Sequence, residues 1–166
     1  MSLTLILMRH AKSGWDDPIV TDDERRLTPR GINDARAMGA WLHTAGLSPD
    51  VVLCSDASRT RQTVAELMAN AETPMPPKVT GALYNASSDV LIQQIKRQTA
   101  NILLVCAHNP GIGLAARQLA LTPPHHPRFD DYPTAATTVI QFDTARWPDI
   151  NRGTVTHFVI PADLNA

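Results

Sequence analysis

Two side chains that can bind or attack an anion, Arg9 and His10, stand directly after an apolar run that begins at Leu3. A short apolar run without alternation is typical of a strand buried on both faces, as in a parallel sheet covered by helices. Such sheets hold their ligands at the carboxyl ends of the strands. An imidazole at that edge can act as a nucleophile or a base, and a guanidinium can donate paired hydrogen bonds to a phosphate or a carboxylate.

Similar strand ends occur twice more along the chain. The strand expected over 51–54 leads into Ser55, and Arg59 falls in the first turn of the helix expected behind it. The strand expected over 102–106 is followed by His108 and then by another helix. Because parallel strands end at the same edge, we expect these ends to bring two imidazoles and two guanidiniums together without a matched set of carboxylates. The pattern predicts an anion pocket, and a phosphoryl group suits it best.

The elements between these strand ends alternate regularly. Thr28 is a good N-cap for a helix that starts with Pro29 and ends at Gly46, and further helices are expected behind Ser58, after Asp89 and through 114–120. Late strands are expected over 137–142 and, as a half-buried edge strand, over 154–160. Three strand–helix alternations followed by late strands predict an α/β protein, a three-layer α/β/α sandwich with a mostly parallel sheet. We find no internal repeat and no domain boundary, so we expect one domain over 1–166.

Three irregular stretches, 12–26, 72–88 and 121–136, carry no readable specificity code. The first follows directly from His10, and we expect it to wall the site, since long loops in compact domains are usually functional or disordered. The third contains the adjacent pair His125 and His126. Their spacing is not that of a zinc site, so we expect a solvated loop there.

The composition is that of an ordinary globular protein. The chain has 166 residues, 43% of them hydrophobic, and a formal net charge of −1, which argues against nucleic acid as a partner. Cys54 and Cys106 each end an apolar run and are expected to be buried thiols in a reducing compartment. No run reaches the length of a membrane span and residues 1–8 lack the features of a signal peptide, so we expect a cytoplasmic protein without a membrane partner. The oligomeric state stays open.

Four motifs carry a resemblance to the histidine phosphatase superfamily, and more closely to its short SixA-like phosphohistidine phosphatases. They are Arg9-His10-Ala11-Lys12-Ser13, Leu27-Thr28-Pro29-Arg30-Gly31, the Ser-x-x-x-Arg-x-x-Gln-Thr pattern over 55–63, and His108-Asn109-Pro110. The first motif has Ala11 where many members have Gly. The motifs follow one another in the family's order, and the resemblance extends from residue 3 to about residue 120.

The resemblance implies a phosphoglycerate mutase-like fold and a role for each matched residue. His10 would take the phosphoryl group, Arg9 and Arg59 would clamp its oxygens, and His108 would stabilise them from the other side. No metal and no cofactor is implied. Three further residues are candidates for substrate binding: Ser13, Lys12 and Asp16. Ser13 and Lys12 are candidates because they follow His10 closely in the sequence. Asp16 falls where mutase-like members have an Asn in the pocket.

One part of the superfamily pattern is absent. Larger members carry a Glu or Asp after the second helix that protonates an alcohol leaving group, whereas the stretch 83–88 here has no carboxylate before Asp89. SixA-like members also lack this acid, and a phosphohistidine leaves as an imidazole, which needs less help than an alkoxide. The missing acid therefore argues against mutase activity, although Asp16 or Asp22 could supply acid help from an unmatched position.

We therefore expect a metal-independent phosphatase that forms a covalent phosphohistidine on His10 and acts on phosphohistidine in proteins. Two alternatives stay open: a phosphatase of a small phosphoester, and a phosphate-binding adaptor without catalytic activity. The second is less favoured because binding alone would not require His10.

Overall fold

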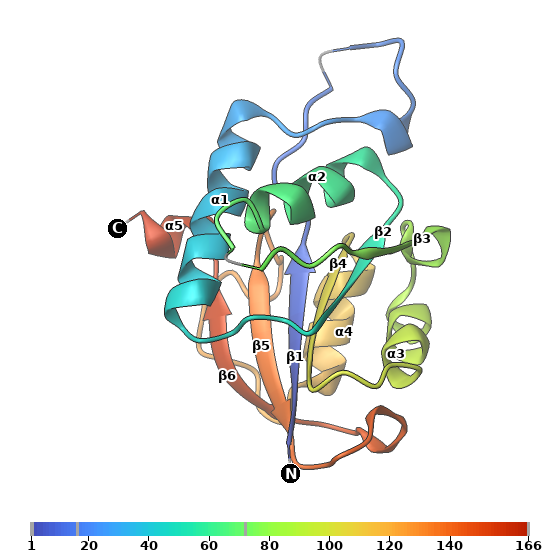
Figure 1. Ribbon diagram of the computed structural model, residues 1–166, viewed down its shortest axis with the longest axis vertical. Coiled ribbons are helices and arrows are strands. Elements are labelled where there is room, and N and C mark those ends of the chain that lie inside the picture. The colour runs from blue at the N-terminus through green and yellow to red at the C-terminus, as the bar shows by residue number, and fades with distance from the viewer. Residues whose placement is uncertain (1, 16, 72, 166) are drawn as a thin grey trace.

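One sheet contains the six strands found within residues 2–15, 17–71 and 73–165, which are the residues that the computed structural model describes (Figure 1). Its strand order is β3-β2-β4-β1-β5-β6. The parallel part comprises β1 (Leu3–Arg9), β2 (Val51–Ser55), β3 (Lys78–Thr80) and β4 (Ile102–Ala107). The antiparallel pair β5 (Thr137–Phe142) and β6 (Thr154–Val159) extends the sheet beyond β1. The predicted mostly parallel sheet is confirmed.

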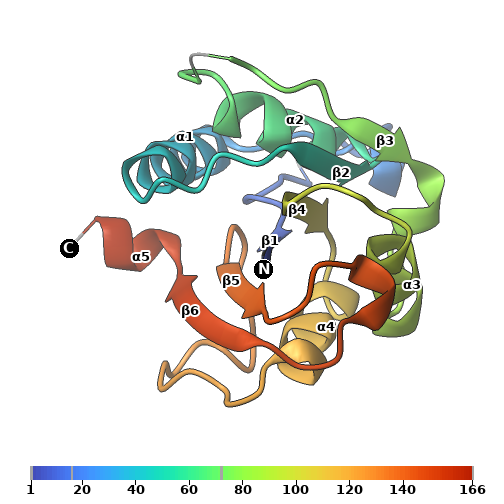
Figure 2. The same cartoon turned by 60° about the horizontal axis from the view of Figure 1, so that its bottom comes forward.

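Helices cover both faces of this sheet. On one face lie α1 (Pro29–Thr44) and α2 (Ser58–Leu67), and on the other lie α3 (Ser88–Lys96) and α4 (Gly111–Leu119), as Figure 2 shows. The short helix α5 (Pro161–Leu164) follows β6 and contacts α1. Three 3₁₀ turns complete the elements: η1 (Asp22–Glu24), η2 (Gly81–Leu83) and η3 (Trp147–Asp149). The predicted three-layer α/β/α sandwich is therefore correct.

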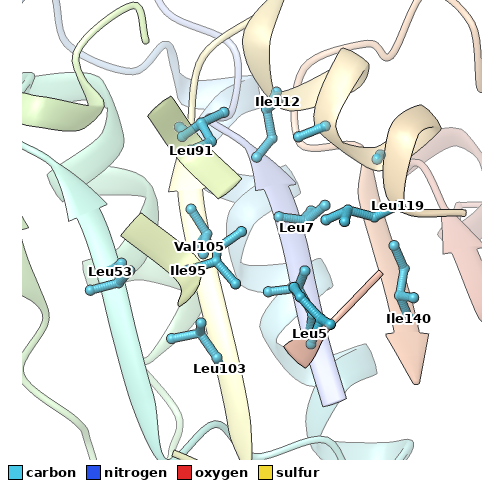
Figure 3. Packing of buried hydrophobic residues seen from close by; sticks show 14 of the residues in the cluster. Leu5, Leu7, Leu53, Leu91, Ile95, Leu103, Val105, Ile112, Leu119 and Ile140 are labelled. Carbon is cyan, nitrogen blue, oxygen red and sulfur yellow. The ribbon is translucent and has the colours of Figure 1, made fainter. Parts of the chain in front are cut away.

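The strand β1 lies in the middle of the core. Leu5 and Leu7 pack with residues of α3 and α4, such as Leu91 and Ile112 (Figure 3), and the alternate residues of β1 pack against α1 and α2 on the opposite face. Side chains of a strand point alternately to its two faces, so a continuous apolar run is what a strand covered on both faces requires.

The loop after β1 is fastened to the start of α1. Thr28 accepts a hydrogen bond from the Gly31 amide through its hydroxyl, as the N-cap interpretation predicts, and its own amide donates to the main-chain oxygen of Lys12 at 2.9 Å. A Cβ on Gly31 would lie 2.2 Å from that same oxygen, so only glycine permits this approach. The start of α1 thereby holds the chain just beyond His10.

Short elements are where the sequence-based prediction is wrong. The stretch 72–88, predicted to be irregular, contains the edge strand β3, which pairs with Leu53–Ser55 of β2. The helix α5 also has no counterpart in the prediction. Elements of three or four residues are too short to display a period of apolar residues. Within the described ranges of the chain, none of the helices has the length and apolar character needed to cross a bilayer.

Candidate active site

The carboxyl ends of β1, β2 and β4 meet at one edge of the sheet, the upper edge in Figure 1. There the ring centroids of His10 and His108 lie 5.3 Å apart. The His108 Nε2 atom lies 2.8 Å from the Ser55 hydroxyl oxygen, so the end of β4 touches the end of β2 directly. The parallel topology thus brings the three strand ends together, as the sequence analysis predicts.

His10 is held by its neighbours on both sides. Its amide donates to Ala107 and its carbonyl oxygen accepts from Ala135, while the ring Nδ1 lies 2.7 Å from the main-chain oxygen of Ala11. A carbonyl oxygen only accepts hydrogen bonds, so Nδ1 carries the hydrogen and Nε2 keeps its lone pair. The pKa of His10 is lowered to about 3, mainly by burial; the neighbouring His108, Arg59 and Arg9 also lower it, and the hydrogen bond to Ala11 opposes this shift. The ring is therefore neutral at neutral pH.

His108 is equally enclosed. Burial, followed by the charge of Arg59, lowers its pKa to about 4. The ring of Tyr84 lies edge-on to it, with centroids 5.4 Å apart. Ser55 also accepts from the amide of Ala57, which leaves its hydroxyl hydrogen free to donate to His108 Nε2. In that arrangement the remaining nitrogen, Nδ1, carries the hydrogen of the neutral ring.

Arg9 is anchored through a main-chain oxygen of a distant loop. Its Nη1 donates to the oxygen of Tyr132 at 3.0 Å, and the side-chain amide of Asn109 donates to the same oxygen at 2.9 Å. The Tyr132 hydroxyl in turn donates to the main-chain oxygen of Leu7 inside the core. The loop 121–136 is thus tied to β1 at the base of the site and fixes the direction of the Arg9 side chain.

Arg59 lies in the first turn of α2 and is only 3% exposed. Both of its terminal nitrogens are taken by one residue: Nη1 donates to the main-chain oxygen of Asp22 at 2.6 Å, and Nη2 donates to the Asp22 carboxylate at 3.1 Å. The same carboxylate accepts from the Tyr84 hydroxyl and from Arg25. The hydrogen bond from Tyr84 is the main cause that lowers the pKa of Asp22 to about 2, so the group is ionised at neutral pH.

Three buried nitrogen atoms have no hydrogen-bond partner among the described residues: Nε of Arg9, Nε of Arg59 and Nδ1 of His108. Buried polar groups are normally satisfied, so unpaired nitrogens on three residues of one site are donors that remain available to a ligand. With their positive charge, the two guanidiniums suit an oxyanion with several acceptor oxygens.

The three candidate substrate-binding residues have different surroundings. The Ser13 hydroxyl accepts from Arg25 at 2.9 Å, which links it to the Asp22 cluster. The Lys12 side chain is exposed, and its contacts to Thr28 are made through its main-chain oxygen. Asp16 lies outside the described residues. Substrate binding by Lys12, Ser13 and Asp16 stays a prediction.

Sequence reasoning missed two side chains of this site. Tyr84 stands in the stretch 83–88, where only a carboxylate was sought, and Arg25 lies in a charged run that resembles any solvated loop. The available signal was that this run belongs to the stretch 12–26, which follows the Arg9-His10 turn. Residues 22–25 do contact Arg59 and Ser13, so the loop walls the site as predicted. In the described part of the chain, no three His, Cys, Asp or Glu side chains form a group that could hold a metal ion.

Comparison with known proteins shows the family of this chain. Residues 5–87 match the sequence model of the histidine phosphatase superfamily, branch 1. An uncharacterized protein of Mycobacterium tuberculosis is 35% identical over 153 residues, which cover 88% of this chain and 93% of that protein. The chain belongs to the histidine phosphatase superfamily.

Solved structures of this superfamily share the whole fold. The structure named for the phosphohistidine phosphatase SixA of Nakamurella multipartitia is 28% identical, covers 97% of both chains and gives a TM-score of 0.82. The protein histidine phosphatase SixA complexed with tungstate superposes with a TM-score of 0.80 at 24% identity, over 98% of this chain and 99% of that chain. Together with the family match, the Nakamurella structure identifies the chain as a phosphatase, a hydrolase with the phosphoglycerate mutase-like fold.

Proposed function

We propose that this histidine phosphatase removes the phosphoryl group from phosphohistidine in proteins, without a metal, through a covalent intermediate on His10. The observation that carries the proposal is the contact between His10 Nδ1 and the Ala11 oxygen at 2.7 Å. It places the free lone pair on Nε2, and the low pKa of the ring, about 3, keeps that lone pair available at neutral pH. A neutral imidazole fixed in one tautomer is a prepared nucleophile.

The reaction divides into two displacements at phosphorus. In the first, the Nε2 lone pair of His10 forms a bond to phosphorus, and the bond between phosphorus and the substrate imidazole breaks, its electron pair going to the leaving nitrogen. With a proton on its other nitrogen, the substrate ring leaves as neutral imidazole. In the second, a water oxygen forms a bond to the phosphorus of phosphorylated His10. The P–N bond breaks and its electron pair goes back to Nε2, while the attacking water loses a proton to the solvent. Inorganic phosphate and neutral His10 result.

Fixed positive charge would supply most of the rate acceleration. Phosphoryl transfer spreads negative charge over three equatorial oxygens, and donors already held in place around them lower the barrier. Arg9 and Arg59 would provide the charge, and His108 would add a hydrogen bond from the opposite side. The anchoring of Arg9 through Tyr132 and the enclosure of Arg59 at 3% exposure support this assignment, since both side chains lose little freedom on binding.

The Asp22 carboxylate, which contacts Arg59, supports a substrate with a good leaving group. Asp22 has a pKa of about 2 in its contacts with Tyr84 and Arg59, so it holds no proton to give at neutral pH. An alkoxide leaving group depends on such a proton, whereas a protonated phosphoimidazole does not. This chemistry favours phosphohistidine over alkyl phosphates.

Exposed apolar side chains beside the site support a protein as the substrate. Trp15 is 73% exposed and lies against Arg25, and Ile19 on the same loop is 89% exposed. Leu114 of α4 is half exposed and lines a hollow with Asn109, the residue after His108. Exposed apolar side chains on the segments that follow His10 and His108 suit contact with a macromolecule better than with a small phosphoester.

The proposal also covers the cellular compartment and the domain organisation of the enzyme. Both cysteines are free and buried, and they face each other across β2 and β4 without forming a disulfide. Unpaired thiols of this kind support a reducing compartment, the cytoplasm. We further propose that residues 1–166 act as a single domain, because one sheet links the strands from both ends of the chain.

A substrate panel tests the proposed function. The purified enzyme is assayed with a protein carrying phosphohistidine, with p-nitrophenyl phosphate and with phosphoserine, and His10→Ala serves as the control. We expect a kcat/KM for phosphohistidine higher by about 10²-fold or more, with no turnover by the variant. A preference for a small phosphoester would favour the alternative phosphatase, and binding of phosphate without any turnover would leave the adaptor.

A further inference from the structure

An internal anion already occupies the guanidinium that the proposed function assigns to the phosphoryl group. The Asp22 carboxylate accepts from Nη2 of Arg59 at 3.1 Å, and the Asp22 main-chain oxygen accepts from Nη1 at 2.6 Å. These are the two parallel donors with which an arginine holds a phosphate or a carboxylate. Asp22 thus contacts Arg59 much as a bound oxyanion would.

The carboxylate is held in this position from other sides as well. The Tyr84 hydroxyl donates to the oxygen that faces Arg59, and Arg25 donates to the other carboxylate oxygen at 3.1 Å through Nε and at 3.0 Å through Nη2. Arg25 itself is fixed, because its guanidinium stacks on the Trp15 ring at 3.5 Å and donates to Ser13. The contact with Arg59 is therefore part of a connected network and not a chance meeting of two surface charges.

We propose that Asp22 is a built-in competitor of the phosphoryl group, which takes the Arg59 guanidinium whenever substrate and product are absent and so weakens the binding of inorganic phosphate. The proposal rests on the proposed function, because it takes Arg59 to be a phosphoryl clamp. Its consequence for the reaction is release of product: phosphate leaves more readily when a carboxylate stands ready to replace it on the arginine. The same displacement weakens the binding of every oxyanion that needs Arg59.

The negative charge of Asp22 determines the sign of its effect on phosphate affinity. A phosphate dianion that takes Nη2 of Arg59 must displace the carboxylate from it. A phosphate that instead uses the unpaired Nε binds to the same guanidinium as the carboxylate and is repelled by it. Both routes lower the affinity for phosphate. Because the pKa of Asp22 is about 2, protonation does not relieve this competition near neutral pH.

Calorimetric titration with inorganic phosphate at constant ionic strength tests the proposal. In Asp22→Asn the side chain keeps its shape and loses its charge, and we expect phosphate to bind about tenfold more tightly than to the unchanged enzyme. The matched control is Asp23→Asn, since Asp23 lies in the same turn η1 and accepts from Thr21. Phosphate affinity in the control stays unchanged. An affinity for phosphate in Asp22→Asn that is equal or weaker overturns the proposal.

A second variant covers the case in which Asp22→Asn does not fold. Tyr84→Phe removes the hydroxyl that holds the Asp22 carboxylate toward Arg59, and we expect a smaller increase in phosphate affinity, by a factor of about three. An unchanged or lower affinity in that variant contradicts the proposal. Failure of the proposed function is seen separately, because the loss or retention of turnover in His10→Ala does not enter the binding measurement.

Discussion

The Nδ1 atom of His10 lies 2.7 Å from the main-chain oxygen of Ala11, and this contact decides which ring nitrogen is free. We expect nitrogen NMR of the unliganded enzyme to show a protonated Nδ1 and an unprotonated Nε2 on this ring. Because the pKa of His10 is about 3, the ring signals stay constant between about pH 8 and pH 5. A titration midpoint near the ordinary histidine value, or a hydrogen on Nε2, would contradict the nucleophile assignment.

Replacement of Arg59 by lysine tests the role of its paired donors. Lysine keeps the positive charge but presents one ammonium in place of the planar guanidinium. We expect kcat/KM of Arg59→Lys to fall by about 10²- to 10³-fold, the usual effect of removing one preorganised donor from an anionic transition state. The matched control is Arg61→Lys, two residues further along α2 and exposed to solvent. Equal activities of the two variants would show that Arg59 does not contact the phosphoryl group.

The two site histidines also make stability depend on pH. In the folded protein the pKa values of His10 and His108 are about 3 and about 4, whereas both rings have ordinary values in the unfolded chain. Between about pH 6.5 and about pH 3 the unfolded chain therefore binds more protons than the folded protein, in which His108 takes up its proton near pH 4 and His10 near pH 3. The contribution of these two rings to the free energy of unfolding is complete above this window and is lost as the pH is lowered through it.

Urea denaturation at about pH 7 and about pH 5 measures this effect, and His108→Gln reduces the difference between the two pH values. In His125→Gln the difference stays as in the unchanged protein, since that side chain lies in an exposed part of the loop. A free energy of unfolding that rises on acidification would mean that the rings are charged in the folded protein.

The sequence alone predicts that the four central residues lie together, because neighbouring parallel strands all end at the same edge of the sheet. These residues are Arg9, His10, Arg59 and His108. Once the apolar runs ending near Arg9, Ser55 and His108 are taken as neighbouring parallel strands, their ends must meet, and the structure brings His10 and His108 to 5.3 Å. The cap of α1 is equally local: Thr28 and Pro29 specify its start through their own chemistry.

The Asp22–Arg59 contact could not be predicted, because it depends on the path of a loop. The two residues are 37 positions apart, and the run Asp22-Asp23-Glu24-Arg25-Arg26 has the composition of a solvated surface. Tyr84 was missed for a different reason, since its hydroxyl takes a place in the site where the resemblance directs attention to a carboxylate. Such contacts are set by tertiary packing and leave no periodic pattern in the sequence.

The central claim, that His10 Nε2 accepts the phosphoryl group, is tested most directly by isolating the intermediate. The enzyme is mixed with a labelled phosphoryl donor, quenched rapidly in alkali and digested, and the labelled peptide is identified by mass spectrometry. We predict a phosphate on His10 that is stable in alkali and lost in acid, and no label in His10→Ala. An enzyme that turns over substrate while carrying no label, or whose His10→Ala variant keeps the activity, would contradict the account.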